Sequence, residues 1–145
     1  MSEIITADEA VEKIYVIHCL DDLSCGMVDN GSRFGGSVKR MSVYPEHRAW
    51  QQTTADPASP HFIKKVAAGP LESDDGKYMI GSMFIIEASR EAIDAFLSQD
   101  PFTAAGVWEN ITINRWVSTR GIMRVNMEMD GTDRTTLRMV VDWNS

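Results

Sequence analysis

The pattern of apolar and polar positions predicts three strands. Ile14–Leu20 is a nearly continuous apolar run with several β-branched residues, which is typical of a strand buried on both faces. Tyr78–Ala88 has the same character. Trp108–Val117 alternates instead, which places Trp108 and Asn110 on the same face of their strand. We expect these segments to belong to one sheet.

A first helix is expected after the first strand. Pro45 is well placed at a helix start because its missing amide hydrogen costs nothing there. The helix then carries His47 and Trp50. The segment Asp56–Pro60 interrupts it, and Ser59 and Pro60 favour a restart through Val66. A kinked or two-piece helix is therefore expected.

A second helix follows Ser89 and ends before Pro101, with an apolar face formed by Ala92, Ile93, Phe96 and Leu97. The polar, glycine-rich segment Asp21–Arg40 indicates a long loop, and such loops often act as lids. Gly69–Pro70 is expected to end the helical segment that precedes it. Asp74–Gly76 is typical of a hairpin turn, so a fourth strand before this turn is expected to pair with Tyr78–Ala88. A terminal hairpin is expected between Ile122–Met129 and Thr135–Trp143. In this hairpin, the face formed by Met123, Val125, Met127 and Met129 is expected to pair with the face formed by Leu137, Met139, Val141 and Trp143.

The resulting order is strand, helix, strand, strand, helix, strand, which predicts an α+β fold with a ferredoxin-like split βαβ sheet. All 145 residues are expected to form a single domain, with its core at about 13–117, the long loop at 21–40 and the hairpin extension at 120–145. The helices cover one sheet face. A second copy of the chain would bury the other, so a homodimer forming an α/β barrel is expected.

Charge and composition limit the classes of partner that the chain is expected to bind. The net charge of −7 disfavours contact with nucleic acid or an anionic membrane surface, because both are negatively charged themselves. No segment approaches the roughly 18 apolar residues that a spanning helix needs. The two cysteines, Cys19 and Cys25, are too few for a disulfide framework and lack the spacing of a zinc or redox motif. A cytoplasmic protein with reduced thiols is expected, with no membrane or nucleic-acid partner.

Several short motifs occur in an order that resembles the YciI-like (YCII) family of dimeric ferredoxin-like α/β barrel proteins. They are a Tyr-Val-Ile strand, a histidine on the first helix, Ala-Gly-Pro-Leu at 68–71, Gly-Ser at 81–82 before an Ile-Ile-Glu-Ala strand end, Asp-Pro-Phe at 100–102 and Ala-Gly-Val-Trp-Glu at 105–109. The resemblance covers about residues 13–117. It implies a pocket for proton transfer and no cofactor.

The resemblance also implies a catalytic dyad of His47 and Asp100. A carboxylate orients an imidazole and raises its basicity, which suits general acid–base work. The match departs from the family pattern in two places, because Arg48 follows the histidine and the segment around Pro57–Pro60 lengthens the spacing to Gly69. His61 is therefore a rival, and His47 is preferred because it lies in an uninterrupted helical segment.

Other side chains are candidates for substrate binding: His18, Arg33, Phe34, Trp50, Trp108 and Asn110. Arg33 and Phe34 can close over an anionic aromatic substrate if their loop is a lid. Purely structural roles are the alternatives. His18 is then a buried histidine of a strand, Arg33 and Phe34 belong to a flexible loop, and the two tryptophans are core residues. The three histidines have no metal-ligand spacing, so no metal site is expected, and buried Cys19 is not expected to be a nucleophile.

Two functions from different classes remain. The first is a cofactor-independent lyase or isomerase, as the family resemblance implies, in which His47 and Asp100 eliminate HX, dehydrate or tautomerise a small, aromatic-derived ring substrate. The second is a noncatalytic dimeric protein that binds a small ligand or assists a pathway, because one fold hosts many functions. An enzyme needs His47 and a carboxylate to meet beside an enclosed pocket, whereas a binding protein needs only the cavity.

Overall fold

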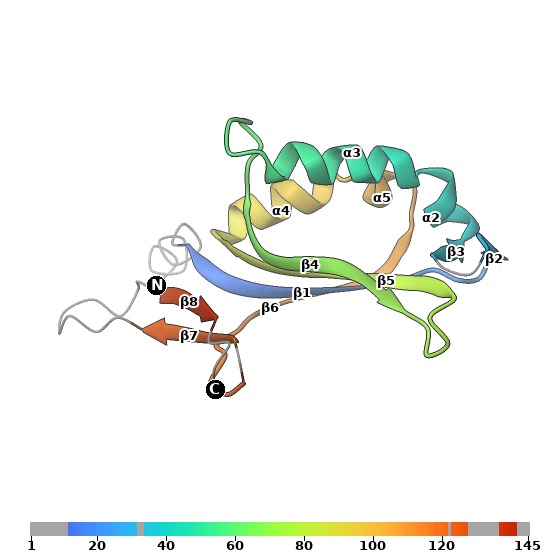
Figure 1. Ribbon diagram of the computed structural model, residues 1–145. Coiled ribbons are helices and arrows are strands. Elements are labelled where there is room, and N and C mark those ends of the chain that lie inside the picture. The colour runs from blue at the N-terminus through green and yellow to red at the C-terminus, as the bar shows by residue number, and fades with distance from the viewer. Residues whose placement is uncertain (1–11, 32–33, 122, 128–136, 142–145) are drawn as a thin grey trace, which may run out of the picture.

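The computed structural model describes residues 12–31, 34–121, 123–127 and 137–141. Four long antiparallel strands lie side by side in the order β4-β5-β1-β6, and two helices cover one face of the sheet (Figure 1). These elements follow the predicted ferredoxin-like order. Their bounds are β1 Lys13–Asp21, α3 Tyr44–Ala55, β4 Lys64–Glu72, β5 Tyr78–Ala88, α4 Arg90–Gln99 and β6 Trp108–Arg115.

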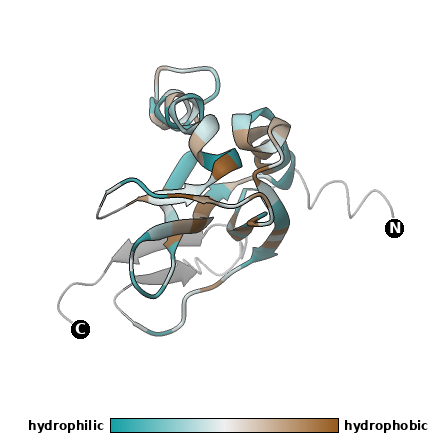
Figure 2. Cartoon of the chain, turned by 90° about the vertical axis from the view of Figure 1, so that its right-hand side faces the viewer, coloured by the Kyte–Doolittle hydropathy of each residue, from teal (hydrophilic) through white to brown (hydrophobic). Residues whose placement is uncertain are grey.

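Buried apolar side chains fill the space between the helices and the sheet. Ile17 and Cys19 of β1, Phe84 of β5 and Phe96 of α4 belong to this main core. The short helix α5, Pro101–Ala104, adds the fully buried Phe102. Apolar segments lie where the helices meet the sheet (Figure 2). A smaller cluster around Ile14 and Ile85 lies apart from the main core, with partly buried Val16, Val66, Met83 and Trp116 packed against it.

The segment Asp21–Arg40 is not the long loop predicted from its glycines. It contains two short strands and the start of a helix: β2 Met27–Val28, β3 Gly35–Ser37 and α2 Val38–Ser42. β3 pairs in parallel with the start of β5. A Cβ on Gly35 would lie 2.5 Å from the Val28 carbonyl oxygen, so this glycine allows two backbones to approach closely. Glycine here marks tight packing, which composition alone does not distinguish from a loop.

The expected restart of the first helix is also wrong. α3 ends at Ala55, turns follow, and Val66 lies in β4, which pairs with β5 from Lys64 onward. Pairing with an adjacent long strand outweighs the weak helix signal of Ser59 and Pro60. Pro70, expected to end a helical segment, instead lies within β4. A strand tolerates proline there because β4 pairs only with β5 and forms an edge.

Trp108 and Asn110 do not share a strand face as expected, because β6 contains a bulge between them. Asn110 pairs with Leu20 and Trp108 pairs with Asp21, so two positions on β6 correspond to one step on β1. Trp108 therefore belongs to the core under the helices, whereas Asn110 lies on the opposite face. The alternation predicted from Asn110 to Trp116 holds, and only Trp108 leaves it.

The terminal segment forms the expected hairpin. β7 Met123–Met127 and β8 Leu137–Val141 are antiparallel. The two predicted strand faces meet: Met123 pairs with Val141, Val125 with Met139 and Met127 with Leu137. Met129, Trp143 and the expected turn between the strands lie outside the described residues.

Candidate active site

The carboxylate of Asp100 is held where two helices meet. The residue ends α4 and caps the N-terminus of α5, where its Oδ1 accepts a hydrogen bond of 2.9 Å from the Phe102 amide. The same oxygen lies 2.8 Å from Nδ1 of His47, and Oδ2 accepts from Gln51 Nε2 at 3.0 Å. Asp100 is only 1% exposed, so these three donors replace water around it. The Asp-Pro-Phe corner thus serves both as a helix cap and as the partner of a histidine.

The imidazole of His47 is fixed by its neighbours on α5 and β6. It stacks on Phe102 with ring centroids 3.7 Å apart and planes at 2°, and it lies perpendicular to the Trp108 ring with centroids 6.2 Å apart. Because Asp100 accepts at Nδ1, that nitrogen carries the proton in the neutral ring, and Nε2 carries the lone pair. No described residue forms a hydrogen bond with Nε2. His47 is one of the residues that line a cavity.

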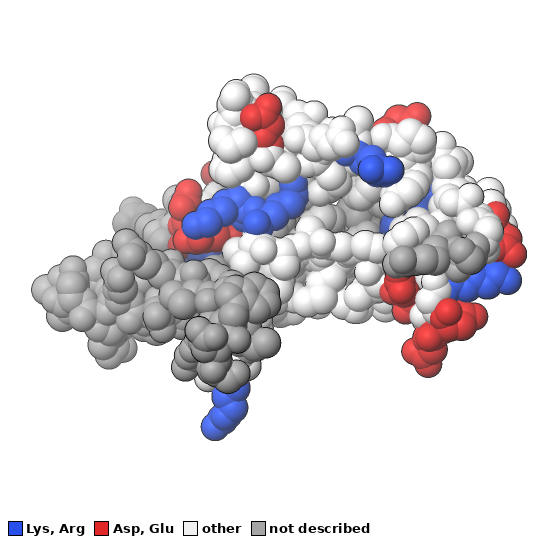
Figure 3. All heavy atoms as spheres, viewed as in Figure 1, with Lys and Arg blue, Asp and Glu red and all other residues white. Residues whose placement is uncertain are grey.

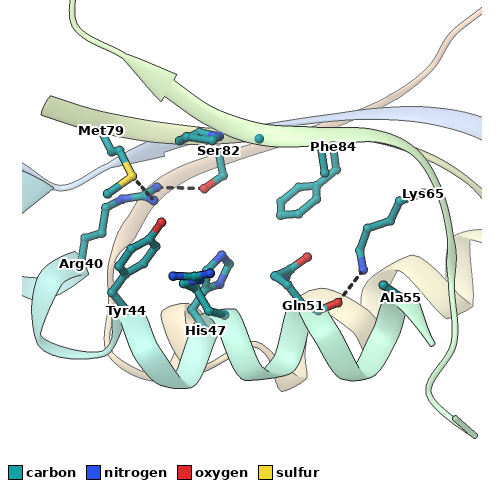
Figure 4. Close-up of a pocket in the computed structure, with 13 residues that line it drawn as sticks. Arg40, Tyr44, His47, Gln51, Ala55, Lys65, Met79, Ser82 and Phe84 are labelled. Carbon is teal, nitrogen blue, oxygen red and sulfur yellow. Dashed lines mark hydrogen bonds between the residues drawn. The ribbon is translucent and has the colours of Figure 1, made fainter. Parts of the chain in front are cut away.

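The cavity, of about 290 Å³, lies between α3 and the strands β4 and β5 (Figure 4). Its polar wall combines His47, Gln51 and Ser82 with three cationic side chains, and no described carboxylate lines it. Basic side chains flank the hollow between α3 and the sheet in the space-filling view (Figure 3). In a chain of net charge −7, this concentration of positive charge suits an anionic or oxygen-rich ligand. The lining residues are Arg40, Tyr44, His47, Arg48, Gln51, Ala55, Lys65, Ala68, Gly69, Pro70, Met79, Ser82 and Phe84.

Arg40 forms one end of the cavity although it is only 1% exposed. Its Nε donates to Asp21 Oδ2 at 2.7 Å and its Nη2 donates to Oδ1 at 3.2 Å, which is a bidentate pair. Nη2 also lies 2.8 Å from the Gly81 carbonyl oxygen and 2.8 Å from Ser82 Oγ. These contacts tie α2 to β1 and β5 and hold the guanidinium rigidly.

Lys65 lies at the other end, on β4. Its Nζ donates to Thr54 Oγ1 at 2.6 Å and to the Gln51 carbonyl oxygen at 3.4 Å, and it lies 5.1 Å from the centre of the Phe96 ring. Partial burial lowers the pKa of Lys65 to about 8, although the negative charge of Asp100 acts in the opposite direction. The charge of Lys65 therefore changes within a pH range that assays can reach.

Residues 31–117 match the family model of the YCII-related domain. The chain belongs to the YCII-related family. A solved structure with a similar fold is 5-chloro-2-hydroxyhydroquinone dehydrochlorinase (TftG) from Burkholderia phenoliruptrix AC1100, in complex with 2,5-dihydroxybenzoquinone. The two share 24% sequence identity with a TM-score of 0.51, and the match covers 73% of this chain and 95% of the dehydrochlorinase chain. No curated protein matches this chain.

In this YCII-related protein, His47 and Asp100 meet as the resemblance implied. The rival His61 is exposed and packs against Trp50, with ring centroids 5.4 Å apart. It lines a second depression, and Asp100 is not among the residues that line it. Trp50 itself is not on the cavity wall. Its indole nitrogen donates to the Phe96 carbonyl oxygen at 3.2 Å, so it joins α3 to α4.

Three more predicted ligand contacts are not made at this cavity. His18 pairs with Met83 and Thr112 on the face of the sheet opposite the helices, because successive strand residues alternate and its neighbours Ile17 and Cys19 face the helices. Asn110 is exposed on that same opposite face as a consequence of the bulge. Phe34 lies before β3 and is not among the lining residues.

Trp108 and Arg33 complete the predicted set. Trp108 lies behind the cavity wall, where its indole nitrogen donates to Ser82 Oγ at 3.3 Å and its ring contacts His47. It supports the site without lining it. Arg33 lies outside the described residues.

Sequence reasoning missed Arg40, Gln51, Lys65 and Ser82. Gln51 was detectable, because it follows His47 by four positions and so shares its helix face. Ser82 belongs to the Gly-Ser motif that supported the resemblance, yet the motif gave it no role. Arg40 and Lys65 were assigned to a loop and to a helix. Lys65 lies in β4, which its pairing with β5 defines, whereas Arg40 lies in the short helix α2, which Ser37 caps.

The structure also bears on a reactive cysteine, a metal site and a membrane-spanning helix. Cys19 is buried, and burial raises the pKa of its thiol to about 12, which disfavours the reactive thiolate. Within the described part of the chain, no three His, Cys, Asp or Glu side chains are grouped so that they could hold a metal ion. No helix in the same ranges has the length and apolar character needed to cross a bilayer.

Proposed function

We propose that this protein is a cofactor-independent lyase or isomerase that moves a proton on a small, ring-derived substrate. His47 is the general base, and Asp100 positions it and stabilises the imidazolium that forms. The observation that carries the proposal is the state of the imidazole: Nδ1 is held by a buried carboxylate, Nε2 has no hydrogen-bond partner among the described residues, and the side chain lines a cavity of about 290 Å³. A volume of that size suits a single substituted ring.

The fold neighbour suggests which reaction to test first. That dehydrochlorinase is named for a chlorinated hydroxyhydroquinone and holds a dihydroxybenzoquinone, and both compounds are rings that carry several oxygens. For this protein we therefore propose HX elimination from an oxygenated ring, with tautomerisation of such a ring as the isomerase variant. The cationic cavity wall supports this class of substrate.

The elimination needs only groups that the chain supplies. For a halogenated hydroquinone the step starts from the diketo tautomer, in which the carbon that bears the halogen and a neighbouring ring carbon are both sp3. Nε2 of His47 takes a proton from that neighbouring carbon. The electron pair of the broken C–H bond becomes a ring double bond, and the leaving group departs with its own bonding pair as a halide. The imidazolium beside Asp100 then returns its proton to water, so atoms and charge balance.

The test compares two histidines of the same chain. His47→Gln removes the base, whereas His61→Gln changes an exposed histidine outside the cavity and serves as the matched control. Halide release and the change in ring absorbance are followed with a panel of chlorinated hydroquinones and hydroxyhydroquinones. We expect His47→Gln to lower kcat at least 100-fold, since general base catalysis contributes about 10²–10⁴, and His61→Gln to behave as wild type.

Circular dichroism and thermal unfolding accompany the kinetics, so that loss of folding is not read as loss of chemistry. Full activity in His47→Gln would overturn the proposed base. Absence of turnover across the whole ring panel by the folded wild-type protein would overturn the substrate class and favour a binding protein.

The proposal includes a homodimer. Val16, Val66, Met83 and Trp116 are only partly buried around the small cluster on the sheet face away from the main core, and a second sheet packed there would remove them from water. Sedimentation velocity should give twice the chain mass of 16.2 kDa. A single species of monomer mass at micromolar concentration would contradict this part of the proposal.

A further inference from the structure

The hydroxyl of Ser82 has an unused proton. Its Oγ accepts a hydrogen bond from Arg40 Nη2 at 2.8 Å and a second from Trp108 Nε1 at 3.3 Å. A guanidinium and an indole N–H are donors only, so neither can receive the hydroxyl proton. A serine hydroxyl has two acceptor sites and one donor, and both acceptor sites are now filled. Among the described residues, no acceptor receives the remaining O–H.

The cavity is where the Ser82 hydroxyl can find an acceptor. Ser82 is 3% exposed, and it lines the same cavity as His47. It shares the inner sheet face with its cross-strand partner Cys19, which is in the main core under the helices. Ser82 comes from β5 and His47 from α3, so they face the cavity from opposite layers (Figure 4). The proton of the hydroxyl is therefore available to a molecule bound between them.

Arg40 adds a second unused donor beside Ser82. Its Nε and Nη2 are bonded to Asp21, Gly81 and Ser82 oxygens, whereas the partner of Nη1 is the sulfur of Met79 at 4.0 Å. A thioether is a weak acceptor, so Nη1 retains donor capacity, and Arg40 is one of the residues that line the cavity. The cation also polarises the Ser82 hydroxyl through their hydrogen bond, which strengthens the hydroxyl as a donor.

We propose that Ser82 Oγ–H and Arg40 Nη1 form an oxyanion site, and that the substrate is a ring whose carbonyl, enol or phenol oxygen binds there. The inference rests on the proposed function and specifies its substrate class. When His47 takes the ring proton, the electron pair delocalises onto this oxygen, which becomes an enolate. Ser82 and Arg40 stabilise that charge by hydrogen bonds and transfer no proton. When the pair returns to the ring, it expels the halide.

Fixed donors suit this role because they need no reorganisation as charge develops. Arg40 is locked by its bidentate pair with Asp21, and that carboxylate offsets its formal charge. The developing oxyanion is therefore matched by the imidazolium formed at His47, and the site as a whole gains no net charge. Two oriented donors on one side and one base on the other also fix which ring carbon loses its proton.

A binding experiment tests the site without requiring turnover. The probe is 4-nitrophenol, whose ionised form has a distinct absorbance, and the matched neutral ligand is 4-nitroanisole, in which a methyl ether replaces the phenol. We expect the wild-type protein to bind 4-nitrophenolate more tightly than the ether, and to favour ionisation of the bound phenol. Ser82→Ala should weaken binding of the phenolate about 10- to 100-fold, the usual effect of losing a hydrogen bond to a charged group, and leave the ether unaffected.

Two further variants separate the hydroxyl from folding. Ser82→Thr keeps a hydroxyl on the same carbon and should retain most of the phenolate affinity. Ser98→Ala removes an exposed serine hydroxyl on α4 and should match wild type. If Ser82→Ala is unstable, Ser82→Cys takes its place. A thiol is a weaker donor than a hydroxyl, so phenolate binding should fall while ether binding stays, and an equal loss of both ligands would overturn the site.

Equal loss of phenolate and ether binding in Ser82→Ala, unchanged phenolate binding, or no phenolate binding by wild type would each overturn the oxyanion site. Failure of the proposed function can be told apart from failure of the oxyanion site. A His47-dependent turnover that is indifferent to Ser82→Ala would leave the base in place and refute this inference, whereas Ser82-dependent phenolate binding without any turnover would support the site and refute the enzyme.

Discussion

Replacing Asp100 by Asn should lower kcat of the proposed reaction about 30- to 1,000-fold while His47 keeps its orientation. The Phe102 amide points at Oδ1 from 2.9 Å, so it holds the oxygen of an asparagine at that position. That oxygen still accepts from His47 Nδ1. The new amide group faces Gln51, whose own side-chain amide can rotate to present its oxygen. The substitution therefore removes a charge and preserves the geometry.

The magnitude follows from the lost ion pair. Nδ1 and Oδ1 are 2.8 Å apart, and the two charge centres of the ionised pair lie about 4 Å apart, which corresponds to about 4 kcal/mol at an effective dielectric constant of about 20. If the proton is half transferred in the transition state, about 2 kcal/mol of this is lost, or roughly 30-fold in rate. Complete transfer gives the upper limit of roughly 1,000-fold.

The assay combines kinetics with a direct view of the ring. Turnover of the best substrate from the ring panel gives kcat, and ¹⁵N NMR of the His47 side chain reports which nitrogen carries the proton. Asp100→Asn should keep the proton on Nδ1, and Asp100→Ala, which leaves Nδ1 without an acceptor, should populate both tautomers. The reasoning is refuted if Asp100→Asn turns over like wild type, or if its kcat falls by much more than the upper limit of about 1,000-fold while Nδ1 remains protonated.

Two further predictions concern the cavity wall and the sheet. The pKa of Lys65 is about 8 in the folded state and 10.5 in the unfolded chain, so between these values the unfolded chain binds more protons and the free energy of unfolding should rise with pH. Urea unfolding at pH 7.5 and pH 10 should show this rise in the wild type and not in Lys65→Met. The same change with pH in both proteins would contradict the prediction. Gly81→Ala should cost about 1–3 kcal/mol because its Cβ would lie 2.4 Å from the Cys19 carbonyl oxygen and 2.9 Å from Leu71 Cδ1. Gly69→Ala, with open space around its Cβ, is the control, and an equal loss in both variants would show that the contact does not matter.

Local patterns in the sequence identified the elements whose causes are local. The apolar runs of β1 and β5, Pro45 at the start of α3 and Ser89 at the N-cap of α4 all appear as predicted. Ser89 Oγ accepts from the Ala92 amide at 3.1 Å, an interaction within one helical turn. Such signals depend on neighbouring residues only, so composition and spacing are enough to find them.

The resemblance supplied more of the site than the physical pattern did. Asp100 is a helix cap on local grounds, and nothing in its neighbourhood indicates that the same oxygen also receives His47 from 53 residues away. The family motif carried that pair. It did not carry the donors around Ser82, because the two acceptor sites of Ser82 are filled by Arg40 and Trp108, which come from other elements.

The sequence by itself therefore determined the order of the main elements and the starts of α3 and α4, and the family resemblance supplied the residues of the dyad. Only the tertiary structure decided which strand face each residue occupies and which side chains share the cavity. One bulge in β6 moved Trp108 to the core and left Asn110 outside, and pairing with β5 placed Lys65 in a strand. The reason is physical. Strand register and close backbone approach are set by partners distant in the chain, whose pairing energy outweighs the weak local preferences of the segment itself.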